Sequence, residues 1–132
     1  RAGRRITMEK VHIFDLEGTR FPAGRRTRVV IGQNGAITGD KFCQGYVVID
    51  PNGKIPEHEH ETVESYTIIK GTGRMTVDGE TQAIGPGDCV FIPSMKKHAL
   101  VNTGSEDMHM IFVYAPSVIV DHWAQEKRGE LK

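Results

Sequence analysis

The sequence is poor in cysteine. Its two cysteines, Cys43 and Cys89, follow no metal-binding or redox spacing. A secreted, disulfide-linked scaffold of this size would normally carry more of them. We therefore expect a cytoplasmic protein that folds around an apolar core.

Long apolar runs and a charge of one sign are also missing. No stretch approaches the roughly 18 consecutive apolar residues of a membrane-spanning helix, and no signal-peptide pattern opens the chain. Lysine and arginine together number 17, as do aspartate and glutamate, so the formal net charge is zero. Balanced charge argues against a chain that coats nucleic acid. We expect neither a membrane nor a nucleic-acid partner.

The positive charge is nevertheless uneven. Arginines crowd the first 28 residues, at positions 1, 4, 5, 20, 25, 26 and 28. Met8 resembles a natural start, so residues 1–7 are left out of the fold prediction. Basic residues are usually solvated. The alternative is that Arg26 or Arg28, on a predicted strand, binds an anionic substrate.

Glycine and proline divide the chain into short segments, with 15 glycines and 6 prolines. The segments between them are rich in Val, Ile, Phe, Tyr and Thr, and they cover residues 27–31, 42–49, 64–70, 74–77, 80–84, 89–92, 98–102 and 108–114. Short strands at this spacing predict an all-β sandwich or barrel. We expect one domain: an N-terminal arm (1–26), a barrel (27–115) and a C-terminal extension (116–132) that forms a short helix or an extra strand.

Three histidines and one glutamate form the main candidate site. His58 and His60 are two residues apart, so on a strand their side chains share a face. Glu64 follows four residues later, and His98 begins another predicted strand. Imidazole nitrogen and carboxylate oxygen together suit first-row divalent ions. The alternative is a set of solvated histidines on a polar segment.

The residues around this set resemble the two sequence motifs of the cupin superfamily. The first motif is matched by Asn52-Gly53, His58, His60, Glu64 and Gly71. The second is matched by Gly87, Pro93, His98 and Asn102. Two residues depart from the motifs, because Asn52 and Met95 stand where the family carries glycine. Asparagine tolerates a left-handed backbone, whereas Met95 predicts a differently shaped turn before His98.

The resemblance implies a small single-domain cupin of the "cupin 2" type, a jelly-roll barrel also described as a double-stranded β-helix. It also implies that His58, His60, Glu64 and His98 lie inside the barrel and hold one divalent transition-metal ion. Manganese or iron is favoured, and zinc, nickel, cobalt and copper are the alternatives. A closed structural zinc site would normally use thiolates.

Strand alternation suggests what else faces the metal. Tyr66 shares a face with Glu64, so it is the candidate catalytic acid or base. The alternative is an aromatic core residue whose hydroxyl finds a partner. Gln44 and Tyr46 share a face of their own strand, and with Arg28 they are candidate substrate-pocket residues.

The function implied by the resemblance is a metal-dependent enzyme on a small organic acid, sugar derivative or diketone. Dioxygenase and lyase or isomerase chemistry both stay open, because a fold hosts many chemistries. Glu64-x-Tyr66 is similar to the arrangement in cupin dimethylsulfoniopropionate lyases. The alternatives are a non-catalytic, metal-containing cupin that binds a sugar or other small ligand, and an idle scaffold for assembly. We expect a homodimer, with the arm around Val11 to Phe14 as a swapped or edge-adding strand.

Overall fold

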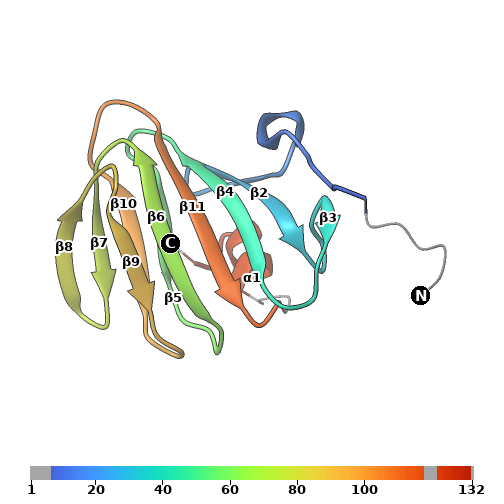
Figure 1. The fold of residues 1–132 in the computed structure, drawn as a ribbon. Coiled ribbons are helices and arrows are strands. Elements are labelled where there is room, and N and C mark those ends of the chain that lie inside the picture. The colour runs from blue at the N-terminus through green and yellow to red at the C-terminus, as the bar shows by residue number, and fades with distance from the viewer. Residues whose placement is uncertain (1–6, 118–121, 132) are drawn as a thin grey trace.

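A computed structural model of the chain describes residues 7–117 and 122–131. Two sheets face each other around the core (Figure 1). The larger sheet contains β1 (Thr19–Phe21), β2 (Arg25–Gly32), β3 (Ile37–Thr38), β4 (Cys43–Ile49), β6 (Val63–Lys70), β9 (Cys89–Ile92) and β11 (Met108–Ala115). The smaller sheet contains β5 (Lys54–His58), β7 (Gly73–Val77), β8 (Glu80–Ile84) and β10 (His98–Asn102). The prediction of a single-domain, all-β jelly roll is confirmed.

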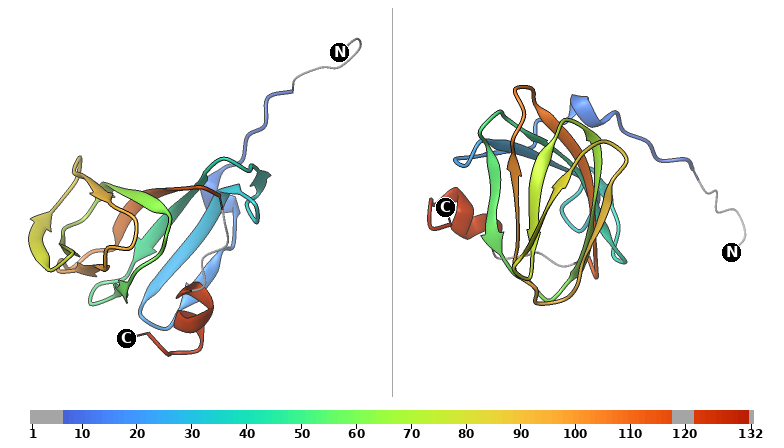
Figure 2. Two further views of the ribbon diagram at one scale, coloured as in Figure 1. Left: turned by 90° about the horizontal axis from the view of Figure 1, so that it is seen from below. Right: turned by 90° about the vertical axis from the view of Figure 1, so that its left-hand side faces the viewer.

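The order of strands mixes distant parts of the chain. The larger sheet runs β1-β2-β4-β11-β6-β9, with β3 paired in parallel to β2, and the smaller sheet runs β5-β10-β7-β8. The described helices are a 3₁₀ turn, η1 (Ile13–Asp15), and α1 (His122–Lys127). Figure 2 shows α1 beside β2, away from the β7–β8 hairpin. No helix in the described ranges is long and apolar enough to cross a membrane.

Three strands, β1, β3 and β5, were not expected from the sequence. Strand β5 is polar and contains Pro56, which argued for a loop, but it lies at the edge of its sheet, where a missing N–H is tolerated. Strand β1 pairs with β2 inside the range expected as an arm. The expectation that the arm around Val11 to Phe14 is a swapped or edge-adding strand in a dimer stays a prediction. That segment leads into η1, and Phe14 packs edge-on against Tyr46, with ring centroids 5.3 Å apart.

The inner face of β11 shows why these residues form a core. Burial alternates strictly along the strand, and Met108, Met110, Phe112 and Tyr114 all point inward. Burying each such side chain contributes about 1.5–3 kcal/mol. Gly45 on the neighbouring β4 makes room for Phe112, because a Cβ at this position would lie 2.4 Å from the ring. The inward-facing side chains of β11 therefore form one wall of the core beside the candidate site.

The two positions that depart from the cupin motifs keep a left-handed backbone. Asn52 has φ of 66° and Met95 has φ of 63°. Asn52 behaves as expected. Met95 adopts the conformation that glycine would supply, so the expectation of a differently shaped turn is not met at this backbone angle. Its N–H donates to the His60 carbonyl oxygen at 2.8 Å, which ties the turn before His98 to the turn that carries His60.

Asn102 joins β10 to the larger sheet. It is buried, its Nδ2 donates to the carbonyl oxygens of Ile49 (2.9 Å) and Glu106 (2.8 Å), and its Oδ1 accepts from the Gly104 N–H (2.9 Å). We expect Asn102→Ala to lower the free energy of unfolding by about 2–4 kcal/mol, because buried backbone groups lose their partners. Urea denaturation measures this. Thr103→Ala, at the exposed neighbouring position, should change stability by less than about 0.5 kcal/mol; equal losses in both variants would contradict the role of Asn102.

Candidate metal centre

Four side chains from different elements converge between the two sheets. His58 ends β5 and His98 begins β10, and the two are direct Cα partners in the antiparallel pair. Glu64 reaches in from β6 of the facing sheet, and His60 lies in the turn between β5 and β6. The candidate ligand atoms of all four lie within 4.8 Å of one another. The convergence that the cupin resemblance implies is present, although β5 ends at His58 and does not include His60.

Backbone carbonyls fix the orientation of the three imidazoles. Each Nδ1 lies within hydrogen-bond distance of a carbonyl oxygen: Pro56 O for His58 (2.7 Å), Thr62 O for His60 (3.0 Å) and Lys96 O for His98 (2.9 Å). A carbonyl only accepts, so Nδ1 of each ring carries a proton, and Nε2 is the atom directed at the centre. This is the tautomer and the outer-shell support that metal-binding histidines require.

The Glu64 carboxylate supplies the negative charge of the centre. Its Oε1 lies 3.1 Å from Nε2 of His60 and 3.4 Å from Nε2 of His98. Burial alone would raise the pKa of Glu64, but the adjacent His60 and His98 imidazoles favour its charged form and outweigh burial, so the pKa is lowered. Nε2 of His98 is buried without a hydrogen-bond partner. Three imidazoles and one carboxylate arranged in this way fit one divalent transition-metal ion.

His58 is kept neutral by its surroundings. Burial, followed by the neighbouring His98, lowers the pKa of His58 from 6.5 to about 3. A neutral imidazole is the form that binds a metal. His60 differs, because the hydrogen bond and charge of Glu64 outweigh burial and raise its pKa.

These shifts predict that the metal-free protein loses stability as the pH falls below 6.5. The unfolded chain protonates His58 near pH 6.5, whereas the folded chain keeps it neutral to about pH 3. The unfolded state then binds more protons, so the free energy of unfolding falls by about 2 kcal/mol between pH 6.5 and 4.5. Glu64 adds to the loss below pH 4.5, because its folded-state pKa is lowered. His60 works in the opposite direction near pH 6.5, because its pKa is raised in the folded state, and its effect levels off once the unfolded chain is also protonated at this residue.

Urea denaturation of chelator-treated protein across this pH range measures the slope. His58→Gln should flatten the slope between pH 6.5 and 4.5, and His12→Gln, at an exposed position, should leave it unchanged. Parallel curves for the wild type and His58→Gln would contradict the lowered pKa of His58.

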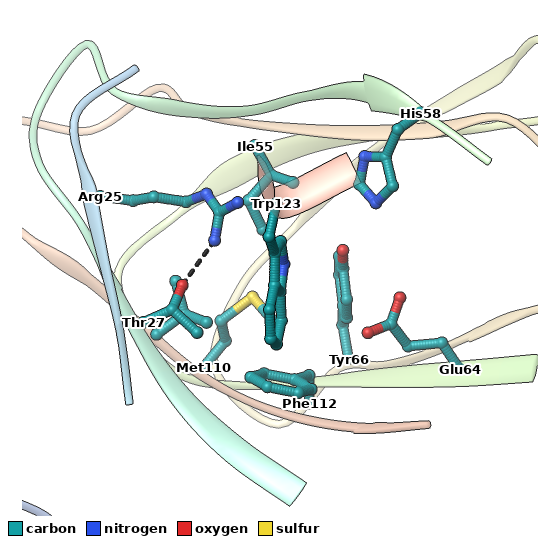
Figure 3. Close-up of a pocket in the computed structure, with 10 residues that line it drawn as sticks. Arg25, Thr27, Ile55, His58, Glu64, Tyr66, Met110, Phe112 and Trp123 are labelled. Carbon is teal, nitrogen blue, oxygen red and sulfur yellow. Dashed lines mark hydrogen bonds between the residues drawn. The ribbon is translucent and has the colours of Figure 1, made fainter. Parts of the chain in front are cut away.

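A small cavity adjoins the centre. Its volume is about 20 Å³, which is room for roughly one water molecule. Its walls are inner-face side chains, namely Arg25, Thr27, Val47, Ile55, His58, Glu64, Tyr66, Met110, Phe112 and Trp123 (Figure 3). Two of the four candidate ligands, His58 and Glu64, therefore line the same cavity as a tyrosine and an arginine.

Tyr66 occupies the position that alternation predicts. It shares the inner face of β6 with Glu64, it is 3% exposed, and its ring centroid lies 6.0 Å from that of His98. Figure 3 shows its hydroxyl directed to the side of the cavity that holds His58. Burial, followed by the charge of Glu64, raises the pKa of Tyr66 well above 10. The hydroxyl is therefore protonated and available as a hydrogen-bond donor.

The structure corrects the placement of Gln44, Tyr46 and Arg28, which lie on the outer face of the larger sheet. The Tyr46 hydroxyl is 2.8 Å from Nδ1 of His109, and Arg28 donates to the Leu16 carbonyl oxygen at 2.7 Å. Gln44 pairs with Val113 on that same face. Alternation grouped Gln44 with Tyr46 correctly, but it does not say which face of β4 is covered. The covered face carries Cys43, Gly45, Val47 and Ile49.

Sequence reasoning missed the arginine that does face the cavity. Arg25 is 2% exposed and shares the inner face of β2 with Thr27, whereas Arg26 and Arg28 point outward. The predicted strand began at residue 27, so Arg25 was left in the arm. Trp123 and Glu126, which reach the core from α1, carried no signal of this contact in their spacing.

Comparison with known proteins supports the same fold. The family described as "cupin domain" matches residues 45–114. A 5-nitrosalicylic acid 1,2-dioxygenase from Bradyrhizobium is 35% identical over 98 residues, which are 71% of this chain and 47% of that protein. The dimethylsulfoniopropionate lyase DddQ of Ruegeria pomeroyi is 38% identical over 72 residues, which are 53% of this chain and 35% of that protein. The chain thus spans less than half of either relative.

Solved structures extend the likeness to nearly the whole chain. The polyketide cyclase RemF of Streptomyces resistomycificus aligns with a TM-score of 0.69 at 22% identity, over 95% of this chain and 99% of that chain. KdgF from Halomonas aligns with a TM-score of 0.73 at 18% identity, over 89% and 99%. At such identities the likeness establishes the fold alone. Together with the match over more than half of its residues, it shows that this chain belongs to the cupin domain family.

Proposed function

We propose that this chain is a metal-dependent enzyme that acts on a small organic acid, with dioxygenase chemistry as the first candidate. The observation that carries the proposal is the set of three Nε2 atoms and one carboxylate oxygen, each imidazole held by a backbone carbonyl. Four protein ligands would leave a transition-metal ion able to bind substrate or oxygen as well, whereas a closed structural zinc site offers no such position. The similarity to a dioxygenase of an aromatic acid supports this substrate class.

Each residue has a distinct task in this proposal. His58, His60, Glu64 and His98 hold one manganese or iron ion, and the ion supplies Lewis-acid charge and a change of oxidation state. Tyr66 acts in proton transfer, as the acid that donates from its protonated hydroxyl to a substrate oxygen. It would act as the base of a lyase only where the charge of the bound cation favours loss of its proton. Apolar cavity walls such as Phe112 keep water away from the reacting atoms.

Lyase chemistry is the second candidate, and a specific observation favours it. Glu64-x-Tyr66 places a hydroxyl beside the centre, and DddQ, a lyase, is a 38% identical relative over part of its length. A lyase needs the charge of the ion and a proton acceptor, but no oxygen. A cupin that binds a sugar or other small ligand without turnover is the remaining alternative.

Oxygen consumption separates these functions. Protein with a measured metal content is given salicylate, 5-nitrosalicylate and related small acids in an oxygen electrode, with chelator-treated protein as the control. We expect oxygen uptake that matches substrate loss and disappears in the control. Turnover without oxygen would replace the dioxygenase by a lyase. Tight binding with no turnover in either condition would overturn the enzymatic proposal in favour of a binding module.

We further propose that the chain forms a homodimer. Val63, Ile69 and Phe91 are 40%, 47% and 64% exposed on the outer face of β6 and β9, and β9 is an edge strand. Pairing of edges or apolar faces through a two-fold axis is the common way to cover them. Light scattering after size exclusion should give twice the chain mass, and a monomer at micromolar concentration would contradict the proposal.

A further inference from the structure

A buried ion pair closes the cavity beside the metal centre. Arg25 on β2 and Glu126 on α1 are 2% and 1% exposed, although 101 residues separate them in the sequence. The Arg25 Nε donates to Glu126 Oε2 at 3.1 Å, and a second guanidinium N–H donates to the other carboxylate oxygen. A further N–H donates to Thr27 Oγ1 at 2.5 Å. Arg25 and Glu126 therefore form a bidentate ion pair.

Stability alone is a weak reason for this pair. Taking two charges out of water costs about as much as their attraction returns, and apolar pairs of similar volume often serve as well. The location offers a better reason, because Arg25 lines the same cavity as His58, Glu64 and Tyr66. The planar guanidinium fork matches a carboxylate in both geometry and charge.

The carboxylate that Arg25 holds belongs to the element that fills the cavity. Trp123, on the same short helix as Glu126, packs edge-on against Phe112 and Tyr114, with ring centroids 6.0 Å and 6.3 Å apart. In Figure 3 its indole stands in the cavity between Arg25 and Tyr66. With α1 in this position the free volume of about 20 Å³ admits a water molecule but no organic acid.

We propose that Arg25 is the residue of this cavity that binds the carboxylate of a ligand. In the absence of a ligand, the Glu126 carboxylate binds the Arg25 guanidinium. A ligand carboxylate replaces Glu126, and α1 then moves away from the cavity. The inference rests on the proposed function and names its substrate class, a small apolar monocarboxylate. The exchange keeps Arg25 paired at every stage, because one carboxylate replaces another and Glu126 returns to water. A neutral analogue leaves the buried guanidinium without a counter-charge, so it binds weakly.

The fluorescence of Trp123 can report the movement of α1, because Trp123 is the single tryptophan of the chain. Purified full-length protein of measured metal content is titrated with benzoate and, as the matched neutral ligand, benzamide. We expect benzoate to shift Trp123 emission to the red and to increase its quenching by acrylamide. Benzamide should require an at least roughly tenfold higher concentration, which is the loss of about one charge-assisted pair. Equal responses to both ligands, or no response to either, would overturn the inference.

Two variants separate binding at Arg25 from binding elsewhere. Glu126→Gln removes the competing charge, so benzoate should bind roughly tenfold more tightly. Arg25→Met/Glu126→Met replaces the whole pair by apolar side chains, so the preference for benzoate over benzamide should vanish. A preference that persists in the double variant would place the carboxylate elsewhere and overturn the inference. Should the double variant fail to fold, an unchanged benzoate affinity in Glu126→Gln would overturn it equally.

The same samples keep this result apart from the proposed function. Elemental analysis and oxygen uptake test the metal-dependent enzyme, whereas the ligand preference of the Trp123 signal tests only the role of Arg25. A purely structural ion pair would change the unfolding midpoint of these variants and leave the benzoate-to-benzamide ratio unchanged.

Discussion

Replacing His98 by alanine is expected to reduce metal content to less than roughly a tenth of an ion per chain and to abolish turnover. Loss of a group that only supports a ligand typically costs 10–100-fold in metal affinity, so loss of a ligand should cost about 100-fold or more. His98 is fully buried, and its Nε2, which has no hydrogen-bond partner, lies 3.4 Å from Glu64 Oε1. Elemental analysis of protein purified without an affinity metal measures the effect.

The matched control for this variant is His12→Ala. His12 lies on the exposed arm, where its ring accepts a hydrogen bond from the Phe14 N–H and packs beside the Phe14 ring, away from the four candidate ligands. The control should retain its metal, and circular dichroism should show that both variants keep the fold. Full metal occupancy in His98→Ala, with unchanged affinity in a competition titration, would refute the proposed coordination sphere.

Tyr66→Phe is expected to lower kcat by about 10²–10⁴ while the metal stays in place, which is the usual contribution of a positioned acid or base. Only the hydroxyl is removed, and the ring keeps its packing in the core cluster. The Tyr66 side chain is buried on the cavity wall beside Glu64. Steady-state kinetics on the substrate found by oxygen uptake, together with metal analysis of the same sample, measures both quantities.

Tyr46→Phe provides the comparison. Its hydroxyl is hydrogen-bonded to His109 on the outer face, so its loss should leave kcat nearly unchanged. If Tyr66→Phe also turned over at the wild-type rate, the proton transfer would have to be assigned to another group. A loss of metal in Tyr66→Phe would instead make Tyr66 a positioning residue for the ligands.

Local patterns were enough to identify the candidate ligands. Spacing and motif gave His58, His60, Glu64 and His98, because a metal centre constrains residue type and interval so strongly that few other arrangements fit. Alternation also gave the partnership of Glu64 with Tyr66, since a strand presents every second side chain to one face. Asp78-Gly79 is a dipeptide typical of two-residue hairpin turns, and it joins β7 to β8 with positive φ at both residues.

Other elements needed the whole structure. Strand β5 was missed because its polar residues and Pro56 argue for a loop, whereas its place at the edge of a sheet and its register with β10 make it a strand. The outward direction of Gln44, Tyr46 and Arg28 depended on which face of the larger sheet the smaller sheet and α1 cover. The alternation of side chains along a strand does not show which face is covered, because the residues of both faces recur every second position.

The sequence by itself determined the strand-rich fold, the four converging ligands and the residue that shares a face with Glu64. Only the tertiary structure decided that Arg25, and not Arg26 or Arg28, faces the centre, and that it meets Glu126 from the far end of the chain. The physical reason is the separation in sequence between the residues that interact. Backbone geometry repeats within a few residues and leaves a readable period, whereas a contact across 101 residues depends on how sheets and helix pack together and leaves no local trace.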